Sequence, residues 1–265
     1  MRKPHISIFL ILCLALLLSL SGCKGSAPSK AMLSSMVAEA ILADEVYEHY
    51  GSECNGEGHK ILGSSISGDR LKVYALTMSG NYGFRNDMFI KVTGTGVIPA
   101  VLTFETDGED YKLLTMEYPG DGTDYGKSIR QMFPLPYRLA ALYHDGGVYR
   151  DLVTQERSYA EEYLKSIGRE AVIGDYSDLN AVLLTDLGVS VDVSNQLFND
   201  RRLNRYPSWI GEAEFIENGM RYVRSLAYDE AARRIVYKTC EWETGAVIET
   251  YSFDAETGEE DTASN

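Results

Sequence analysis

The sequence lacks the residue patterns by which most catalytic and metal sites are recognised. It contains no Gly-x-Ser-x-Gly motif and no His-Glu-x-x-His motif, and no two of its four histidines have the spacing of a zinc-binding helix. Gly94-Thr95-Gly96 lacks the third glycine and the following helix of a dinucleotide-binding loop, so we expect a hairpin turn there. These absences predict a protein without a metal ion, without a cofactor and without an assembled catalytic set.

Positive charge is scarce. The chain has 25 Lys and Arg residues against 39 Asp and Glu residues, which gives a formal net charge of −14. Such an acidic surface excludes nucleic acid as a partner, because binding to phosphates requires clustered Lys and Arg side chains. It also argues against electrostatic binding to anionic lipid.

Long apolar runs are equally rare, and only the N-terminus has one. Ile6 to Leu20 is apolar except for Ser7 and Ser19, and it follows Arg2 and Lys3. A run of about fifteen residues is too short for a comfortable membrane span of roughly twenty, and it has the organisation of a secretory signal. We therefore interpret residues 1–22 as a lipoprotein signal peptide, with an uncleaved N-terminal anchor as the alternative.

The end of this run has the form of a bacterial lipobox, Leu20-Ser21-Gly22-Cys23. The pattern predicts cleavage between Gly22 and Cys23, with diacylglycerol attached to the sulfur of Cys23 and palmitate as a characteristic acyl chain. Residues 23–30 would then form the lipidated N-terminus and a polar spacer. The expected location is the outer face of the cytoplasmic membrane.

Cysteine is rare as well. Of the four cysteines, Cys13 lies in the leader and Cys23 is assigned to lipid, so Cys54 and Cys240 remain. Outside the membrane a disulfide between these two is allowed and would close a long loop. Two free thiols are the alternative, since pairing requires Cα atoms within about 7 Å.

The remaining chain predicts an α+β fold made of two halves, each an antiparallel β-meander packed with helices. The first half, 31–150, has an amphipathic helix over 31–49 and short strands separated by turn residues. The second half, 151–258, begins with helices and ends in another meander, and an acidic tail, 259–265, is expected to fray. The expected strands are 58–66, 70–79, 86–92, 97–106, 111–118, 211–217, 220–228, 233–241 and 246–254, and the other expected helices are 127–133, 137–143, 154–167, 178–187 and 194–203.

Tyrosine is the one excess, with 18 residues. Five of them accompany the prolines of the middle segment. Rings that bury area and keep a hydroxyl suit a carbohydrate or peptide recognition surface, and they equally suit packing between two small domains. The five residues are Tyr118, Tyr125, Tyr137, Tyr143 and Tyr149.

Several phrases of the sequence resemble a known family: Glu57 to Gly63, Leu71 to Leu76, Tyr82 to Phe84, Asp121 to Pro134 and Tyr163 to Arg169. Together they are similar to an uncharacterised extracytoplasmic region of Gram-positive bacteria. That region occurs behind membrane metallopeptidases of the β-lactam-sensor, antirepressor type and in stand-alone lipoproteins. The resemblance spans roughly 45–255 and implies a sensory or accessory envelope domain. It transfers no catalytic residue, because the peptidase part and the acylatable serine motif are missing.

The leading hypothesis is thus a non-catalytic, lipid-anchored envelope domain that binds a cell-wall ligand or a membrane protein. A cell-envelope hydrolase with a carboxylate-based site is the alternative. A cleft with two carboxylates of raised pKa, or His59 or His144 beside a carboxylate, would support it. An assembly factor for a neighbouring membrane protein is the third hypothesis.

Overall fold

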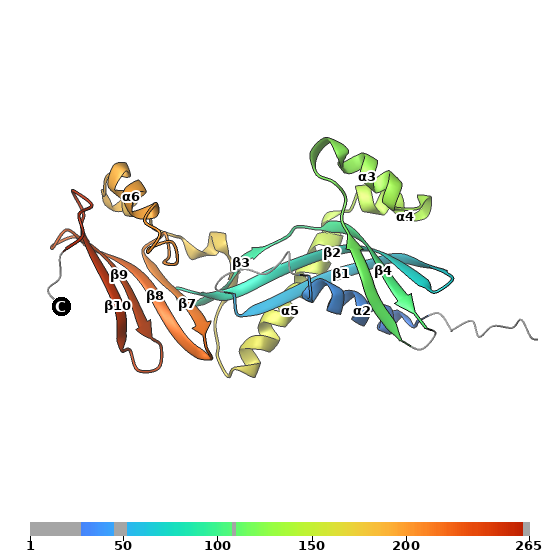
Figure 1. The fold of residues 1–265 in the computed structure, drawn as a ribbon, viewed down its shortest axis with the longest axis horizontal. Helices are drawn as coiled ribbons and strands as arrows, with labels where there is room; N and C mark the ends of the chain where they lie inside the picture. Colours follow the sequence, from blue (N-terminus) through green and yellow to red (C-terminus); the bar gives the residue numbers. More distant parts are fainter. Residues whose placement is uncertain (1–27, 45–51, 108–109, 262–265) are drawn as a thin grey trace, which may run out of the picture. The chain divides into compact units, whose positions relative to one another are not determined.

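The computed structural model describes residues 28–44, 52–107 and 110–261, and it has the α+β fold that the sequence predicted (Figure 1). These residues form two compact units whose segments alternate along the chain. The division differs from the expected boundary at residue 150, because strands β1 and β2 each contribute to both units. Unit 1 contains the described residues of Met1–Ala40, Ile61–Ala75 and Pro99–Tyr143, and unit 2 those of Ile41–Lys60, Leu76–Ile98 and His144–Asn265.

Helix α2 (Lys30–Leu42) is the first described element and follows the predicted pattern. Its buried side chains, Leu33, Val37, Ala40 and Ile41, recur at helical spacing and form one apolar stripe. The helix ends seven residues before the expected position 49, and the residues from 45 onward lie outside the described part of the chain until residue 52.

Four strands supply the sheet of unit 1. They are β1 (Cys54–Ser67), β2 (Arg70–Arg85), β4 (Ile98–Thr106) and β5 (Tyr111–Glu117). β2 pairs with β1 and β4, and β4 pairs with β5 in antiparallel register. Gly68, at φ +62°, forms the tight turn between β1 and β2 that the Ser-Gly-Asp sequence predicted.

Unit 1 is completed by a helical hairpin, α3 (Tyr125–Met132) and α4 (Leu135–Leu142). Pro134 caps α4 and separates the two helices. The inner face of the hairpin packs on the strands through Ile129 and Phe133, which contact a core cluster that includes Tyr74 of β2. Its outer face is described below.

The first part of unit 2 places a long helix, α5 (Gly146–Ser166), against strands β2 and β3 (Met88–Gly94). Tyr82, Phe84 and Phe89 of these strands form one core cluster with Ala160 and Leu164 of α5. The helix begins eight residues before the expected Thr154, because Asp145 acts as its N-cap and accepts hydrogen bonds from the backbone of Gly147 and Val148.

Strands β2 and β3 are joined by a hairpin, and other strands of unit 2 pair with its two strands. Asn86 and Asp87, both with positive φ, form its turn, where the sequence had predicted a strand from residue 86. On one side β3 pairs in parallel with β6 (Ile173–Asp175), a strand that the sequence did not reveal. On the other, Arg85 pairs with Ala213 at the start of the C-terminal meander.

That meander is antiparallel and matches the predicted strands closely. It consists of β7 (Gly211–Glu217), β8 (Met220–Asp229), β9 (Arg234–Glu241) and β10 (Val247–Asp254). Helix α6 (Val191–Phe198) buries Val193 and Leu197 in a core cluster with Leu226, Ile235 and Tyr237 of the meander.

Three local predictions were wrong. Residues 95–97 form no hairpin turn, because β3 and β4 both pair with β2 and follow one another along it. The expected helix 178–187 is two 3₁₀ turns, η3 (Tyr176–Leu179) and η4 (Leu184–Leu187), since Asn180 is left-handed between them. The acidic tail is attached over residues 259–261, where Glu260 bridges to Phe253, and only 262–265 lie outside the description.

Candidate functional site

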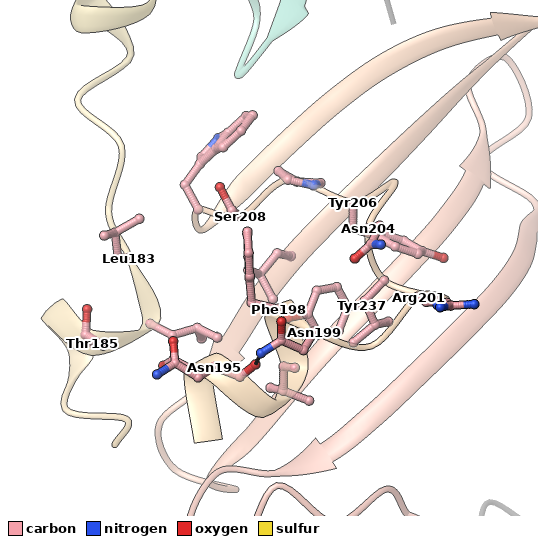
Figure 2. A pocket seen from close by; sticks show the side chains of 17 residues that line it. Leu183, Thr185, Asn195, Phe198, Asn199, Arg201, Asn204, Tyr206, Ser208 and Tyr237 are labelled. Carbon is pink, nitrogen blue, oxygen red and sulfur yellow. Dashed lines mark hydrogen bonds between the residues drawn. The ribbon is translucent and has the colours of Figure 1, made fainter. Parts of the chain in front are cut away.

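A pocket of about 800 Å³ lies in unit 2. Its walls come from three places: η4 with Leu183, helix α6 with the segment that follows it to Trp209, and the meander face with Leu226 and Tyr237. Figure 2 shows side chains from these segments around one space, with Phe198 and Asn195 from α6 and Leu183 and Thr185 from η4.

Local sequence explains how these walls are held. Gly188 is left-handed at φ +85° and ends η4, and Ser190 then starts α6 by accepting a hydrogen bond from the backbone of Val193 (3.2 Å). After the helix, the carboxylate of Asp200 accepts bonds from the Arg202 backbone and guanidinium. The pocket is therefore built on capped helical turns and a tied loop.

Two polar atoms in the lining are buried without a hydrogen-bond partner among the described residues. They are Nε1 of Trp209 and Oγ of Ser194. The Trp209 side chain is only 6% exposed and packs its ring edge-on against Tyr176 (centroids 5.7 Å apart). An unpartnered buried polar atom costs free energy, and both atoms lie beneath the surface of the lining and not at the open space of the pocket.

The ionisable groups of the pocket lining are Tyr206, Tyr237 and Arg201. Burial raises the pKa of Tyr206 and of Tyr237 to about 12, so both phenols stay neutral. The Tyr206 hydroxyl already contacts Thr239 (2.8 Å) and donates to Glu249 (2.9 Å). Arg201 is exposed and has no ion pair or hydrogen bond with the described residues, which leaves one free cation in the lining.

The chemistry that this lining supports is binding. Its described residues include no carboxylate, histidine or cysteine, so the pocket has no general base and no activated nucleophile. It offers apolar surface from Leu183, Leu197 and Phe198, the last of which is 70% exposed. It adds the exposed guanidinium of Arg201 as a donor.

A second group of functional side chains lies buried beneath α5. Nδ1 of His59 is 2.8 Å from Oε2 of Glu57, whose other oxygen accepts a hydrogen bond from Tyr159 (3.0 Å). One turn along the helix, Glu156 accepts from Lys91 (2.7 Å) and from Tyr82 (2.9 Å). Burial raises the pKa of Glu156 against the opposing effect of Lys91, and burial also raises the pKa of Tyr159, to about 12.

Glycines allow the helix to approach these strands so closely. A Cβ atom on Gly58 would lie 2.3 Å from the backbone oxygen of Leu152, and one on Gly56 would lie 2.5 Å from that of Glu156. On β2, a Cβ at Gly80 would lie 1.8 Å from the Glu156 carboxylate. No local pattern predicted this contact, because the partners are distant along the chain.

His59 beside Glu57 is one of the observations that the hydrolase hypothesis required. Both side chains are buried, however, and neither they nor Glu156 line the pocket described above. His144 is exposed. Among the described residues no group of three or more His, Cys, Asp and Glu side chains is arranged to hold a metal ion.

The five tyrosines have different surroundings. Tyr125 and Tyr137 pack into the core cluster of unit 1, where Tyr137 lies 5.3 Å from Tyr74 between ring centroids. Tyr118 is half-buried. Tyr143, in unit 1, and Tyr149, in unit 2, are exposed.

The two cysteines are free thiols in the structure. Cys54 starts β1 and packs against the cluster beneath α5, and burial raises the pKa of its thiol to about 11. Cys240 lies in β9, paired with Val223 and Val247 of its neighbouring strands. The optional disulfide between them is therefore not formed in the structure.

The predicted signal peptide, Gly22 and Cys23 lie outside the described residues. None of the described helices is both long enough and apolar enough to cross a membrane. Comparison of the chain with protein-family models, with curated proteins and with solved structures gives no match.

Proposed function

We propose that this protein is a lipid-anchored, non-catalytic binding protein of the bacterial cell envelope, and that its ligand occupies the pocket between η4, α6 and the meander. The observation that carries the proposal is the lining itself: the exposed guanidinium of Arg201, which has no carboxylate partner among the described residues, shares a pocket of about 800 Å³ with the exposed ring of Phe198. A ligand with an anionic group and an apolar body would pair with both.

The lining also specifies the class of ligand. A volume of about 800 Å³ lies within the range of roughly 300–1,000 Å³ that small-molecule sites have. Leu183, Leu197 and Phe198 favour an apolar body, and Arg201 favours an anionic end. We therefore expect a small amphipathic molecule, such as an acyl chain with a carboxylate or a short apolar peptide with its C-terminal carboxylate.

The location rests on the lipobox. Lipid on Cys23 would hold the mature chain at the outer face of the cytoplasmic membrane, where cell-wall fragments and membrane proteins are the available partners. The resemblance to sensory envelope domains supports the same setting. Replacing Cys23 with alanine tests this part: incorporation of radiolabelled palmitate in cells should be lost, and labelling that persists would contradict the anchor.

The binding proposal has an internal reporter. The chain has two tryptophans, and Trp242 is 45% exposed, so Trp242→Phe leaves Trp209 as the fluorophore inside the pocket. We expect dodecanoate to change its emission saturably, and to bind at least tenfold more tightly than dodecanol because only dodecanoate pairs with Arg201. Arg201→Gln should remove that difference, while Arg150→Gln, an exposed control, should keep it.

Phe198→Ala tests the apolar part of the site. The side chain is exposed, so its removal should leave the unfolding temperature unchanged and weaken dodecanoate and dodecanol alike. The absence of saturable binding, or equal binding by wild type, Arg201→Gln and Phe198→Ala, would contradict the proposal.

A carboxylate-based hydrolase is the second candidate, because His59 contacts Glu57 beneath α5. Hydrolysis of cell-wall peptides or glycans that is lost in Glu57→Gln while the fold is retained would favour it. The burial of both groups favours a structural role for the pair.

A further inference from the structure

The outer face of the α3–α4 hairpin carries an apolar stripe that nothing in unit 1 covers. Leu135 is 76% exposed and Leu139 is 69% exposed, and their spacing of four residues places them on the same face of α4. Tyr143, directly after the helix, is 77% exposed. The inner face of the same hairpin is fully packed, so this stripe is surplus to the core of unit 1.

The charge of the hairpin is opposite to that of the protein. Residues 125–143 contain Lys127, Arg130 and Arg138 and no acidic residue, in a chain whose formal net charge is −14. Arg138 donates hydrogen bonds to the carbonyl oxygens of Arg130 (2.7 Å) and Phe133 (3.2 Å) and so stabilises the end of α3. Lys127 and Arg130 are exposed, and neither has an ion pair with the described residues.

We infer that this face of the hairpin lies on the surface of an anionic phospholipid bilayer. Exposed leucines, exposed cations without ion pairs and an exposed tyrosine within one helical hairpin form the composition of a segment that rests in the membrane interface. Whole-chain charge argued against such binding, but the local charge of the hairpin is complementary to anionic headgroups. A protein partner with an acidic, apolar groove is the competing occupant.

The position of the anchor agrees with this assignment, which here rests on the proposed lipidation. Six residues separate Cys23 from Lys30, where α2 begins, and the seven Cα–Cα steps between the two span at most about 25 Å when fully extended. The part of α2 up to Ala40 belongs to unit 1, as does the hairpin. The lipid would retain the protein at the membrane, and the hairpin would fix the orientation of unit 1 against it.

Vesicle flotation of the mature chain without lipid on Cys23 tests the hairpin independently of the anchor. We expect binding to phosphatidylglycerol vesicles at low ionic strength, weaker binding to phosphatidylcholine vesicles, and release by salt. Lys127→Gln with Arg130→Gln should weaken binding about thirtyfold, at about fivefold per charge. Leu135→Gln with Leu139→Gln should weaken it at least tenfold.

The matched control is Arg150→Gln with Lys165→Gln, which removes the same charge from exposed positions on α5 and should bind like wild type. All four substituted positions of the hairpin are exposed, so unfolding temperatures should not change. As a second readout, Leu139→Trp in a Trp242→Phe background should be quenched by brominated phosphatidylglycerol. The inference is overturned if the chain does not bind these vesicles, or if the hairpin variants bind as tightly as the control. Loss of palmitate labelling at Cys23 remains a separate result and tests only the anchor.

Discussion

Replacing Arg221 with methionine is expected to destabilise unit 2 by about 3 kcal/mol. The Arg221 guanidinium forms two bonds to the carboxylate of Glu53 (2.6 and 2.8 Å) and one to that of Glu214 (2.6 Å). Glu53 is 1% exposed, and its other donor is the hydroxyl of Tyr163 (2.9 Å). Glu214 keeps both of its bonds to Arg169 in the variant. Removing Arg221 therefore leaves the buried Glu53 carboxylate without the cation bonded to it, and Arg85 remains as a more distant positive charge.

The magnitude follows from that asymmetry. Removing one partner of a buried ion pair costs about 3–5 kcal/mol, and the lower end applies because Tyr163 still donates to Glu53. Glu53→Gln should cost only about 1 kcal/mol, since Arg221 retains Glu214. The double variant should be more stable than Arg221→Met alone, because the unpaired carboxylate has been removed with its partner.

Urea unfolding followed by the fluorescence of Trp242 is the assay, since the Arg221 guanidinium lies 6.0 Å from that ring. The decisive comparison is the order of the urea midpoints of Arg221→Met, Glu53→Gln and the double variant. Equal losses from Arg221→Met and Glu53→Gln, or a double variant whose loss is the sum of both, would refute the reasoning.

Three further predictions concern buried groups. Gly58→Ala should lower the free energy of unfolding by about 1–3 kcal/mol in thermal denaturation, because its Cβ would lie 2.3 Å from the Leu152 oxygen, whereas no loss would show that α5 moves freely. Glu156 has a raised pKa in the folded state, so wild-type stability relative to Glu156→Gln should be greatest below pH 4.5 and should fall as the pH rises through the folded-state pKa. A flat difference between the two stability–pH curves would contradict this. The thiol of Cys54, with its pKa raised from 9.0 to about 11, should react with iodoacetamide at pH 8 roughly a hundredfold more slowly in the native than in the unfolded chain, as measured by mass spectrometry, and comparable rates would exclude its burial.

Local sequence patterns were sufficient to predict the strands of the C-terminal meander. β7 was predicted at its observed bounds, and the adjoining strands to within a residue, because Asn218 and Gly219 both take the positive φ that their turn requires. Alternating burial along β9 matches the alternation in its sequence. The exposed start of α5 was missed, since Gly146 and Gly147 resemble a loop unless the capping role of Asp145 is considered.

The candidate sites depend on contacts that no local pattern encodes. Arg221 and Glu53 are 168 positions apart, and Tyr159 meets Glu57 across 102 positions. The pocket combines the 3₁₀ turn η4, which the sequence presented as part of a regular helix, with a meander face more than twenty residues further on. An unpartnered indole nitrogen is visible only when all of its neighbours are placed.

In an acidic chain, a Lys or Arg side chain without a carboxylate partner says more about the binding of anions than an ion pair does. Acidic residues outnumber basic ones by 39 to 25, and the half-buried cations Arg169 and Arg221 are paired with carboxylates. Arg201, in the pocket lining, and Lys127 and Arg130, on the hairpin, have no such partner in the described chain. Arg201 shares the pocket with the exposed Phe198, and Lys127 and Arg130 share the hairpin with the exposed Leu135 and Leu139, which is the combination that amphipathic anions recognise. Because Arg201 belongs to unit 2 and the other two to unit 1, removing charge at the pocket should leave vesicle binding intact, and removing it at the hairpin should leave dodecanoate binding intact.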